Sequence, residues 1–384
     1  GNLTVTSPGF LLKNSTFNGV SSFTRTASAG NHQSDGGNIF NNTLTIDNAG
    51  SSGRIRMSTT TPDIYNGNTT FNSTGGQDVQ LCYTGNSYFY GDITINSNKV
   101  VFNTSNGKVT FAGGNSQSLN GSYNYPFKKL AIDKSANHVT ANTTLSVDDS
   151  LTFVSRNLVT TSSNLLTLKA GSVATGANNS SFISGPIKKI GNTAFVFPVG
   201  KETNFRTVEI TAPSNTTDAF TAEFFDTTQT LGSSMDTTIT FISDCGYWSL
   251  NRTAGSSNIT PKFAFDSTHC DYLTVKPVHI AIWNGTTWVD KGEGVTDSNN
   301  KKTNAALTSY GNFALAYKLM PGDAPQMPYV LTSTSTCSPV EMLFENRDLW
   351  FSFEVDSALI KLGIFATDPN KWYATIKELV LYEN

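Results

Sequence analysis

Charged side chains are scarce in this sequence, and their scarcity excludes several classes of function. Asp, Glu, Lys and Arg make up 14% of the 384 residues, and the formal net charge is −3, whereas typical globular domains are about 25% charged. The lysine pairs at 128–129, 188–189 and 301–302 stand alone, so the sequence predicts no basic patch for nucleic-acid phosphates. No apolar run approaches the ~20 residues that span a bilayer, so no transmembrane segment is expected.

Targeting and cysteine motifs are also absent. The first residues, GNLTVTSPGF, lack a basic region followed by an apolar region and read like a strand from within a domain. This start favours a processed chain cut from a longer protein. The four cysteines form no CxxC pair, which argues against a zinc or redox motif. Cys245 and Cys270 are candidates for a disulfide in an exported protein, and the alternative is two buried free thiols.

The sequence has no recognisable catalytic motif. Its four histidines form no HExxH pattern, and no GxSxG, P-loop or GxGxxG motif is present. The one adjacent acid pair, Asp148 and Asp149, is expected to point to opposite faces of a strand, whereas glycosidase acids share a cleft. We therefore expect no enzyme and no catalytic residue. A structural calcium ion stays open, with Asp35, Asp63 and Asp78 as guesses in Asp- and Asn-rich turns.

Short β-branched runs separated by Gly, Asn, Ser and Asp turns fill the first 190 residues. Each run, such as NTLTID at 42–47 or GDITIN at 91–96, offers only two or three apolar positions for one face. Such runs bury a continuous core only when they stack on one another, which is typical of a β-solenoid. We predict an all-β chain whose residues 1–190 form a right-handed β-solenoid.

The length and composition of the apolar runs change after the predicted solenoid. Residues 191–318 hold longer, aromatic-rich runs, and AIWNGTTWVDKG predicts a hairpin turning at Asn284-Gly285. This region is expected to be an antiparallel β-sandwich. Residues 319–336 predict a Pro-rich, extended linker, and residues 337–384 predict a small β-rich module.

Two surface hypotheses arise from the side chains. Trp283, Trp288, Tyr247 and Trp248 are candidates for stacking on a sugar, with burial in the sandwich core as the alternative. Threonine-rich strands such as 4–6 and 59–61 raise the question of a flat ice-binding array, but a regular Thr-x-Thr ladder is not sustained along the sequence.

An ordered series of segments resembles a known family. The blocks GGNIFNNTLTIDNAGSSGRIRMSTTTPDIYNGNTTFNST (36–74), YFYGDITINSN (88–98) and FISGPIKKIGNTAFVFPVGKETNFRTVEIT (182–211) resemble repeats and a closing signature of large Bacteroidetes-type cell-surface adhesins. Later segments such as GYWSLNR resemble the sandwich that follows those repeats, so the resemblance covers about residues 36–318. No single motif is diagnostic, whereas the order of the segments is fairly specific.

The resemblance implies an extracellular protein exported by the type IX secretion pathway, with an adhesive or gliding-motility role at the cell surface. The tail departs from the family, because residues 337–384 lack both a PNP start and a basic final strand. This departure leaves open whether the tail is a divergent handle for an outer-membrane secretion or anchoring partner. The expected function is structural and adhesive, in a longer adhesin or filament that grips polysaccharide or a solid surface. The alternatives are a carbohydrate-binding module and a polysaccharide-degrading β-helix enzyme.

Overall fold

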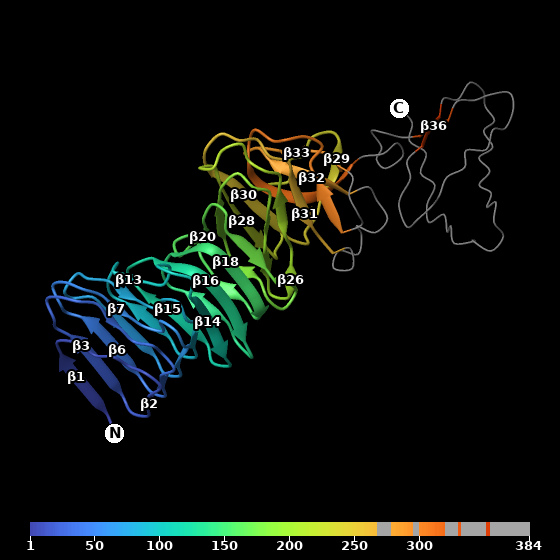
Figure 1. Ribbon diagram of the computed structural model, residues 1–384. Coiled ribbons are helices and arrows are strands. Elements are labelled where there is room, and N and C mark those ends of the chain that lie inside the picture. Colours follow the sequence, from blue (N-terminus) through green and yellow to red (C-terminus); the bar gives the residue numbers. More distant parts are fainter. Residues whose placement is uncertain (267–277, 295–298, 319–328, 332–350, 354–384) are drawn as a thin grey trace.

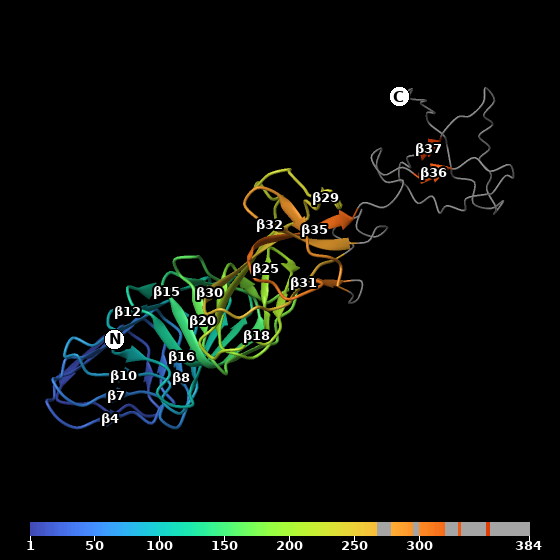
Figure 2. The same ribbon diagram turned by 90° about the horizontal axis from the view of Figure 1, so that it is seen from above.

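The computed structural model describes residues 1–266, 278–294, 299–318, 329–331 and 351–353, which contain strands and no α-helix. The predicted all-β class and β-solenoid are confirmed for these residues, and the solenoid has about eight turns. Its strands stack in parallel from the N-terminal end towards a group of antiparallel strands (Figures 1 and 2).

One face of the solenoid is an eleven-stranded sheet. Each turn of the chain adds one strand, and the strands pair in parallel until the last one, β26. In sheet order they are β1 (Leu3–Ser7), β3 (Ser21–Arg25), β6 (Leu44–Asn48), β9 (Thr69–Asn72), β12 (Ile93–Ile95), β15 (Gln117–Gly121), β17 (Val139–Ala141), β19 (Leu158–Val159), β22 (Ile183–Ser184), β25 (Val199–Lys201) and β26 (Asn204–Phe205).

The second face is a sixteen-stranded sheet that begins in the solenoid and continues beyond it. Its solenoid strands are β2 (Thr16–Phe17), β5 (Ile39–Phe40), β8 (Asp63–Tyr65), β11 (Ser87–Phe89), β14 (Lys108–Gly113), β16 (Tyr125–Lys134), β18 (Leu145–Ser155), β20 (Leu166–Leu168) with β21 (Val173–Thr175) beside β18, and β23 (Ile187–Ile190). A third, four-stranded sheet closes the early turns with β4 (His32–Gln33), β7 (Ile55–Arg56), β10 (Val79–Gln80) and β13 (Val100–Val101).

The core of the solenoid follows from the alternation within each strand. In β6 the side chains of Leu44 and Ile46 are buried and Thr45 between them is half-exposed, because successive strand residues point to opposite faces. Equivalent aromatic rings then stack from turn to turn. Phe40 and Tyr65 have ring centroids 5.3 Å apart, and Tyr65 and Phe89 have centroids 4.5 Å apart, with nearly parallel planes. The turns therefore share one aromatic column rather than separate cores.

One corner of the solenoid repeats a left-handed backbone conformation. Asn14, Gly36, Ser58 and Cys82 have φ angles of 46°, 101°, 52° and 52°, and the Asn14 amide donates to the Gly36 carbonyl on the next turn. A Cβ added to Gly36 would lie 1.9 Å from the carbonyl oxygen of Thr61. Glycine is needed here both for its φ angle and for the close approach of the neighbouring turn.

Pairing changes from parallel to antiparallel where the solenoid ends. β23 pairs antiparallel with β28 (Ala219–Phe225), and the sheet continues through antiparallel strands. These are β30 (Tyr247–Ala254), β35 (Gly311–Lys318), β32 (Val278–Trp283) and β33 (Trp288–Asp290), with β29 (Ile239–Ile242) beside β35. The edge of β23, the last solenoid strand of this sheet, is therefore paired with β28.

A second antiparallel sheet lies against this extension. It contains β24 (Phe195–Phe197), β27 (Val208–Ile210), β31 (Pro261–Ala264) and β34 (Asn300–Lys302). Phe263 from this sheet contacts the rings of Trp248 and Phe313 from the other, at centroid distances of 5.3 and 4.9 Å. These three aromatic side chains join the two sheets through a shared apolar layer.

The predicted hairpin at Asn284-Gly285 is confirmed. Trp283 in β32 pairs with Trp288 in β33, and Gly285 has a φ of 106°. The Asn284 Oδ1 atom accepts hydrogen bonds from the amides of Thr286 and Thr287, both at 2.9 Å. The asparagine side chain thus stabilises the turn that its sequence signal predicts.

Part of the predicted organisation lies outside the described residues. Within 319–336 and 337–384 the structure describes only β36 (Tyr329–Leu331) and β37 (Phe351–Phe353), which pair in parallel. The linker and the C-terminal module therefore stay predictions, as do the domain limits.

Candidate functional site

Two of the four aromatic residues proposed for sugar binding lie in the core. Trp248 is 2% exposed and Trp288 is 0% exposed. Their indole N–H groups are also occupied, since Trp248 donates to the Arg206 carbonyl and Trp288 to the Gly232 carbonyl. Neither ring offers a free face to a sugar in this arrangement.

The other two aromatic candidates keep partly exposed rings. Tyr247 stacks on Phe225 with centroids 4.7 Å apart, and Trp283 packs against Trp288 at 5.6 Å with planes inclined by 56°. The structure thus does not assemble the four rings into one coplanar platform. The sugar-binding hypothesis stays a prediction for Tyr247 and Trp283.

Two of the four cysteines, Cys82 and Cys245, lie among the described residues. Cys245 is half-buried just before β30, and Cys270 lies outside the described residues, so their pairing stays a prediction. Cys82 is a buried free cysteine at the left-handed corner. Burial raises the pKa of the Cys82 thiol to about 12, which makes it a poor nucleophile in the folded protein.

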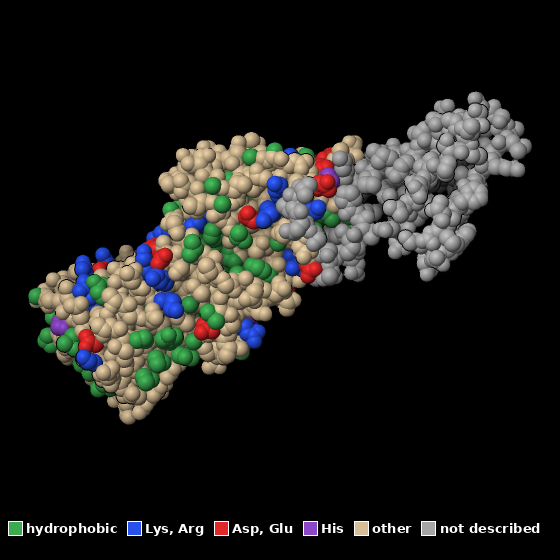
Figure 3. Space-filling view, turned by 45° about the vertical axis from the view of Figure 1, so that its right-hand side comes forward, with side chains coloured by type: hydrophobic (Ala, Val, Ile, Leu, Met, Phe, Trp, Pro, Cys, Tyr) green, Lys and Arg blue, Asp and Glu red, His purple; other side chains and the backbone are tan. Residues whose placement is uncertain are grey.

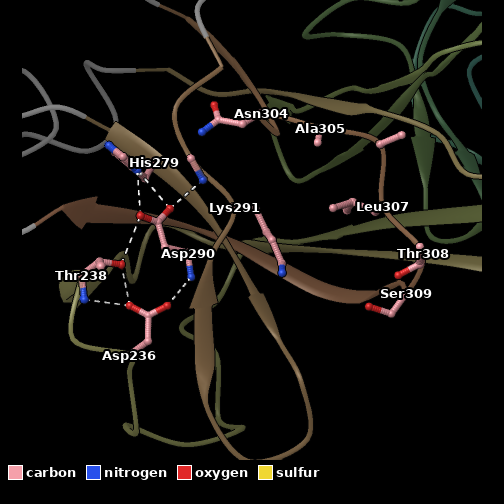
Figure 4. Close-up of a pocket in the computed structure, with 12 residues that line it drawn as sticks. Asp236, Thr238, His279, Asp290, Lys291, Asn304, Ala305, Leu307, Thr308 and Ser309 are labelled. Carbon is pink, nitrogen blue, oxygen red and sulfur yellow. Dashed lines mark hydrogen bonds and ion pairs between the residues drawn. The ribbon is translucent and has the colours of Figure 1, made fainter.

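A polar hollow in the antiparallel region brings several titratable groups together (Figure 4). It has a volume of about 610 Å³ and is open to solvent on one side. His279 on β32 points to Asp290 on β33, and its Nδ1 atom lies 3.0 Å from Oδ1 of Asp290. Asp236 accepts hydrogen bonds from the Asp290 amide and the Thr238 hydroxyl, at 2.8 and 2.6 Å.

The electrostatics of the hollow favour a charged Asp290. Burial opposes its ionisation, but hydrogen bonds from His279, the Gly292 amide and Thr238 outweigh burial and hold the pKa of Asp290 below its usual value. The other imidazole nitrogen, Nε2, lies 3.9 Å from a carboxylate oxygen of Glu293. Among the described residues, no hydroxyl or thiol bonds to this nitrogen. The contact between His279 and Asp290 joins strands β32 and β33.

This cluster was not foreseen from the sequence. The structure buries His279 to 5% exposure, and no histidine motif in the sequence marks it. Asp236 and Asp290 are separated by more than fifty residues and meet only because β33 lies beside the loop that carries Asp236 and Thr238. No local pattern in the sequence could have indicated that contact.

The acids considered for calcium are occupied by protein partners. Asp35 forms an ion pair with Lys13 at 2.7 Å, and Asp78 forms one with Arg54 at 3.3 Å. Asp63 is buried and accepts hydrogen bonds from the amide and side chain of Asn38. Among the described residues, no three His, Cys, Asp or Glu side chains gather as a group that could hold a metal ion.

The adjacent acids at 148–149 also point to separate partners. Asp148 pairs with Lys169 at 2.8 Å, whereas Asp149 lies 3.7 Å from Lys129. They sit where the pairing of β16 with β18 shifts register, between Phe127 and Lys129. The two carboxylates are thus engaged by different lysines.

Two lysines are buried, and none of the acids in the described part of the chain pairs with either. The Nζ atom of Lys134 donates to the Ala112 carbonyl and to the side chain of Gln117. Lys189 donates to the Lys169 and Ser172 carbonyls, both at 2.7 Å. Burial lowers the pKa of Lys134 and of Lys189 to about 8. The two amines therefore link neighbouring turns of the solenoid by donating hydrogen bonds to backbone carbonyl oxygens.

The visible surface of the molecule is largely uncharged. Figure 3 shows backbone and neutral polar atoms over most of one face, with charged side chains scattered among them. Within the described residues no helix is long and apolar enough to cross a membrane.

Comparison with known protein families, with curated proteins and with solved structures finds no match to this chain. The β-solenoid and its side-chain chemistry are therefore the basis on which a function can be argued.

Proposed function

We propose that this chain is a non-enzymatic structural and adhesive protein of a bacterial cell surface, and a fragment of a longer adhesin or filament. The observation that carries the proposal is the sixteen-stranded sheet, which runs from β2 through the solenoid into the antiparallel strands without a break in pairing. A rod of this kind gives reach and stiffness, because each turn is hydrogen-bonded along its length to the next.

The side-chain chemistry of the solenoid and of the antiparallel region fits a scaffold better than a catalyst. The column that includes Phe40, Tyr65 and Phe89 fills its interior with apolar rings. The polar hollow has its acids and its histidine engaged with one another. A neutral wall of hydroxyls and amides suits contact with polysaccharide or a solid surface.

In this proposal the two antiparallel sheets form a β-sandwich that closes the solenoid, and residues 337–384 serve as a secretion or anchoring handle. The family resemblance supports export by the type IX pathway and a role in adhesion or gliding motility. An extracellular location also suits the low charge and the proposed Cys245–Cys270 disulfide.

The test is fractionation of the native cells, followed by negative-stain microscopy of the surface fraction with antibody labelling. The proposal expects label on thin filaments or rods outside the outer membrane. Recovery of the protein as a soluble monomer, with no labelled surface structure, would overturn it and favour a secreted binding module or enzyme.

A further inference from the structure

A buried amine and a buried side-chain amide meet between the two large sheets of the solenoid. Lys134 is the last residue of β16 in the sixteen-stranded sheet, and Gln117 is the first residue of β15 in the eleven-stranded sheet. Lys134 is 0% exposed and Gln117 is 1% exposed. The Nζ atom of Lys134 lies 2.5 Å from the Oε1 atom of Gln117. We call these two residues the amine–amide pair.

Both members of the amine–amide pair are held in place by hydrogen bonds. The Nε2 atom of Gln117 donates to the carbonyls of Phe89 and Gly91, at 2.8 and 2.9 Å, and its Oε1 atom accepts from the amine. The Nζ atom also donates to the Ala112 carbonyl at 3.1 Å. The Cδ carbon of Gln117 is bonded to Oε1 at about 1.2 Å, so a small rotation of the lysine side chain brings Nζ against that carbon.

The surroundings of the pair favour the neutral form of the amine, which carries the lone pair that a nucleophile needs. Burial lowers the pKa of Lys134 to about 8. About a tenth of such an amine is neutral at pH 7, against about three in ten thousand for an ordinary lysine. The acceptors of the amine are a backbone carbonyl and a neutral amide, and neither stabilises the charged form as a carboxylate does.

We propose that the folded chain joins the amine–amide pair through a covalent isopeptide bond. The lone pair of Nζ attacks Cδ of Gln117, a bond forms between these two atoms, and the bond between Cδ and Nε2 breaks. One proton passes from Nζ to Nε2, and Nε2 leaves as ammonia. Atoms and charges balance without an oxidant, a reductant or a second reactant. The product links the eleven-stranded sheet to the sixteen-stranded sheet through side chains.

Three features of the pair assist this step. Holding two groups against each other replaces a collision between separate molecules, and well-oriented pairs reach effective concentrations of about 10⁵–10⁸ M. The carbonyls of Phe89 and Gly91 face Nε2 and stabilise the positive charge that develops there as ammonia leaves. Burial of both side chains excludes water, which would otherwise compete with the amine for Cδ.

The reaction is slow, because no acid in the described part of the chain pairs with the amine to carry the proton between the two nitrogens. A freshly folded chain therefore still holds the free amine, and the bond accumulates with age. Lys189 is the matched comparison. Burial also lowers its pKa to about 8, but its amine donates to the carbonyls of Lys169 and Ser172 and to the Ser172 hydroxyl. These partners include no side-chain amide that could release ammonia.

The inference goes beyond the proposed surface role, because the bond forms in the purified chain wherever the protein resides. Failure of either proposal leaves the other standing. The test ages the whole folded chain and follows its intact mass. The expected result is loss of the mass of one ammonia molecule, about a hundredfold faster at about pH 10 than at about pH 6, as the neutral fraction of the amine rises. Digestion and tandem mass spectrometry should then find Gln117 and Lys134 in one cross-linked peptide.

Two variants identify the reacting groups. Lys134→Arg keeps the positive charge, but a guanidinium stays protonated and does not attack, and Gln117→Glu removes the nitrogen that leaves. Neither variant should lose ammonia from this pair, and either one suffices if the other proves unfolded by circular dichroism. Lys189→Arg is the control and should lose ammonia at the rate of the unmodified chain.

A folded chain that keeps its full mass after ageing at alkaline pH would overturn the inference. Loss of ammonia that persists in Lys134→Arg would also overturn it, because the ammonia would then come from other amides such as asparagine side chains. The unmodified chain aged in urea is a further control. Equal cross-linking of Gln117 to Lys134 in the unfolded chain would show that the fold does not direct the reaction.

Discussion

At the scale of single residues, the solenoid holds cationic side chains in its interior, where charged groups are rare. Arg25 is fully buried and donates to the Asn48 side chain and to the carbonyls of Ala29 and Gly30. Lys134 and Lys189 bind carbonyl oxygens in the same manner. Partial negative charges of the backbone therefore replace the carboxylates that usually accompany a buried cation.

The buried lysines make stability depend on alkaline pH in a defined direction. The folded pKa of Lys134 is about 8, below its usual 10.5, so between these values the unfolded chain binds more protons than the folded chain. Raising the pH through this window therefore favours the folded state. In Lys134→Met this gain is absent. We expect the stability of the unmodified chain relative to the variant to rise by about 1–3 kcal/mol between about pH 7 and pH 10.

Urea denaturation of both proteins across this pH range measures the difference. Lys128→Met, at a half-exposed lysine, is the matched control and should follow the unmodified chain. Parallel pH profiles for Lys134→Met and the unmodified chain would show that Lys134 does not lose its proton in this range.

At the scale of the element, the left-handed corner determines how closely successive turns can stack. Gly36→Ala would bring a Cβ against the Thr61 carbonyl at a φ of 101°. Gly30→Ala has a similar φ, 81°, but its Cβ would meet nothing within 4 Å. We expect Gly36→Ala to cost about 3 kcal/mol or more, and Gly30→Ala to cost about 1–2 kcal/mol from its φ alone.

Thermal and urea unfolding of the two variants would measure this contrast. Equal losses would mean that the φ angle, rather than the contact between turns, accounts for the cost at both glycines. A larger loss at Gly30 would contradict the close stacking described for this corner.

The solenoid could be predicted from sequence because its signal is local. Runs such as LTID show buried and half-exposed residues in alternation, and Asn14 and Gly36 occupy a corner that favours them. The register could not be predicted, because Ser21 pairs with Leu44 and Leu44 with Thr69 at unequal separations. A fixed repeat in the sequence would therefore misplace the strands.

The contacts at the candidate sites could not be predicted either, because they too depend on pairing and packing between distant segments. The Asp236–Asp290 contact depends on the pairing of segments that lie far apart in the sequence. The burial of Trp248 depends on how two sheets face each other, and that of Trp288 depends on the packing of strands and a loop from distant parts of the chain. None of these follows from composition or from local spacing.

At the scale of the whole molecule, the antiparallel strands protect the end of the solenoid. Ile187 in β23 is fully buried and pairs with Ala222 in β28. A chain that stops at residue 190 would leave β23 without this partner and expose its unpaired edge. Exposed edges recruit other strands, so we expect the shortened chain to associate or aggregate.

Size-exclusion chromatography with light scattering measures the association. A chain that stops at residue 318 keeps the antiparallel strands and is the control, which should stay monomeric at the same concentration. A monomeric and equally stable chain of residues 1–190 would show that the solenoid needs no closing element.

The unbroken sixteen-stranded sheet also has a mechanical consequence. Its backbone hydrogen bonds run along the long direction of the solenoid, so tension between the two ends of the rod loads them one turn after another. Turns would then detach in sequence, each releasing its own length of chain while the remaining turns stay stacked. Under a sudden pull, a rod of this construction would lengthen in steps rather than break at once.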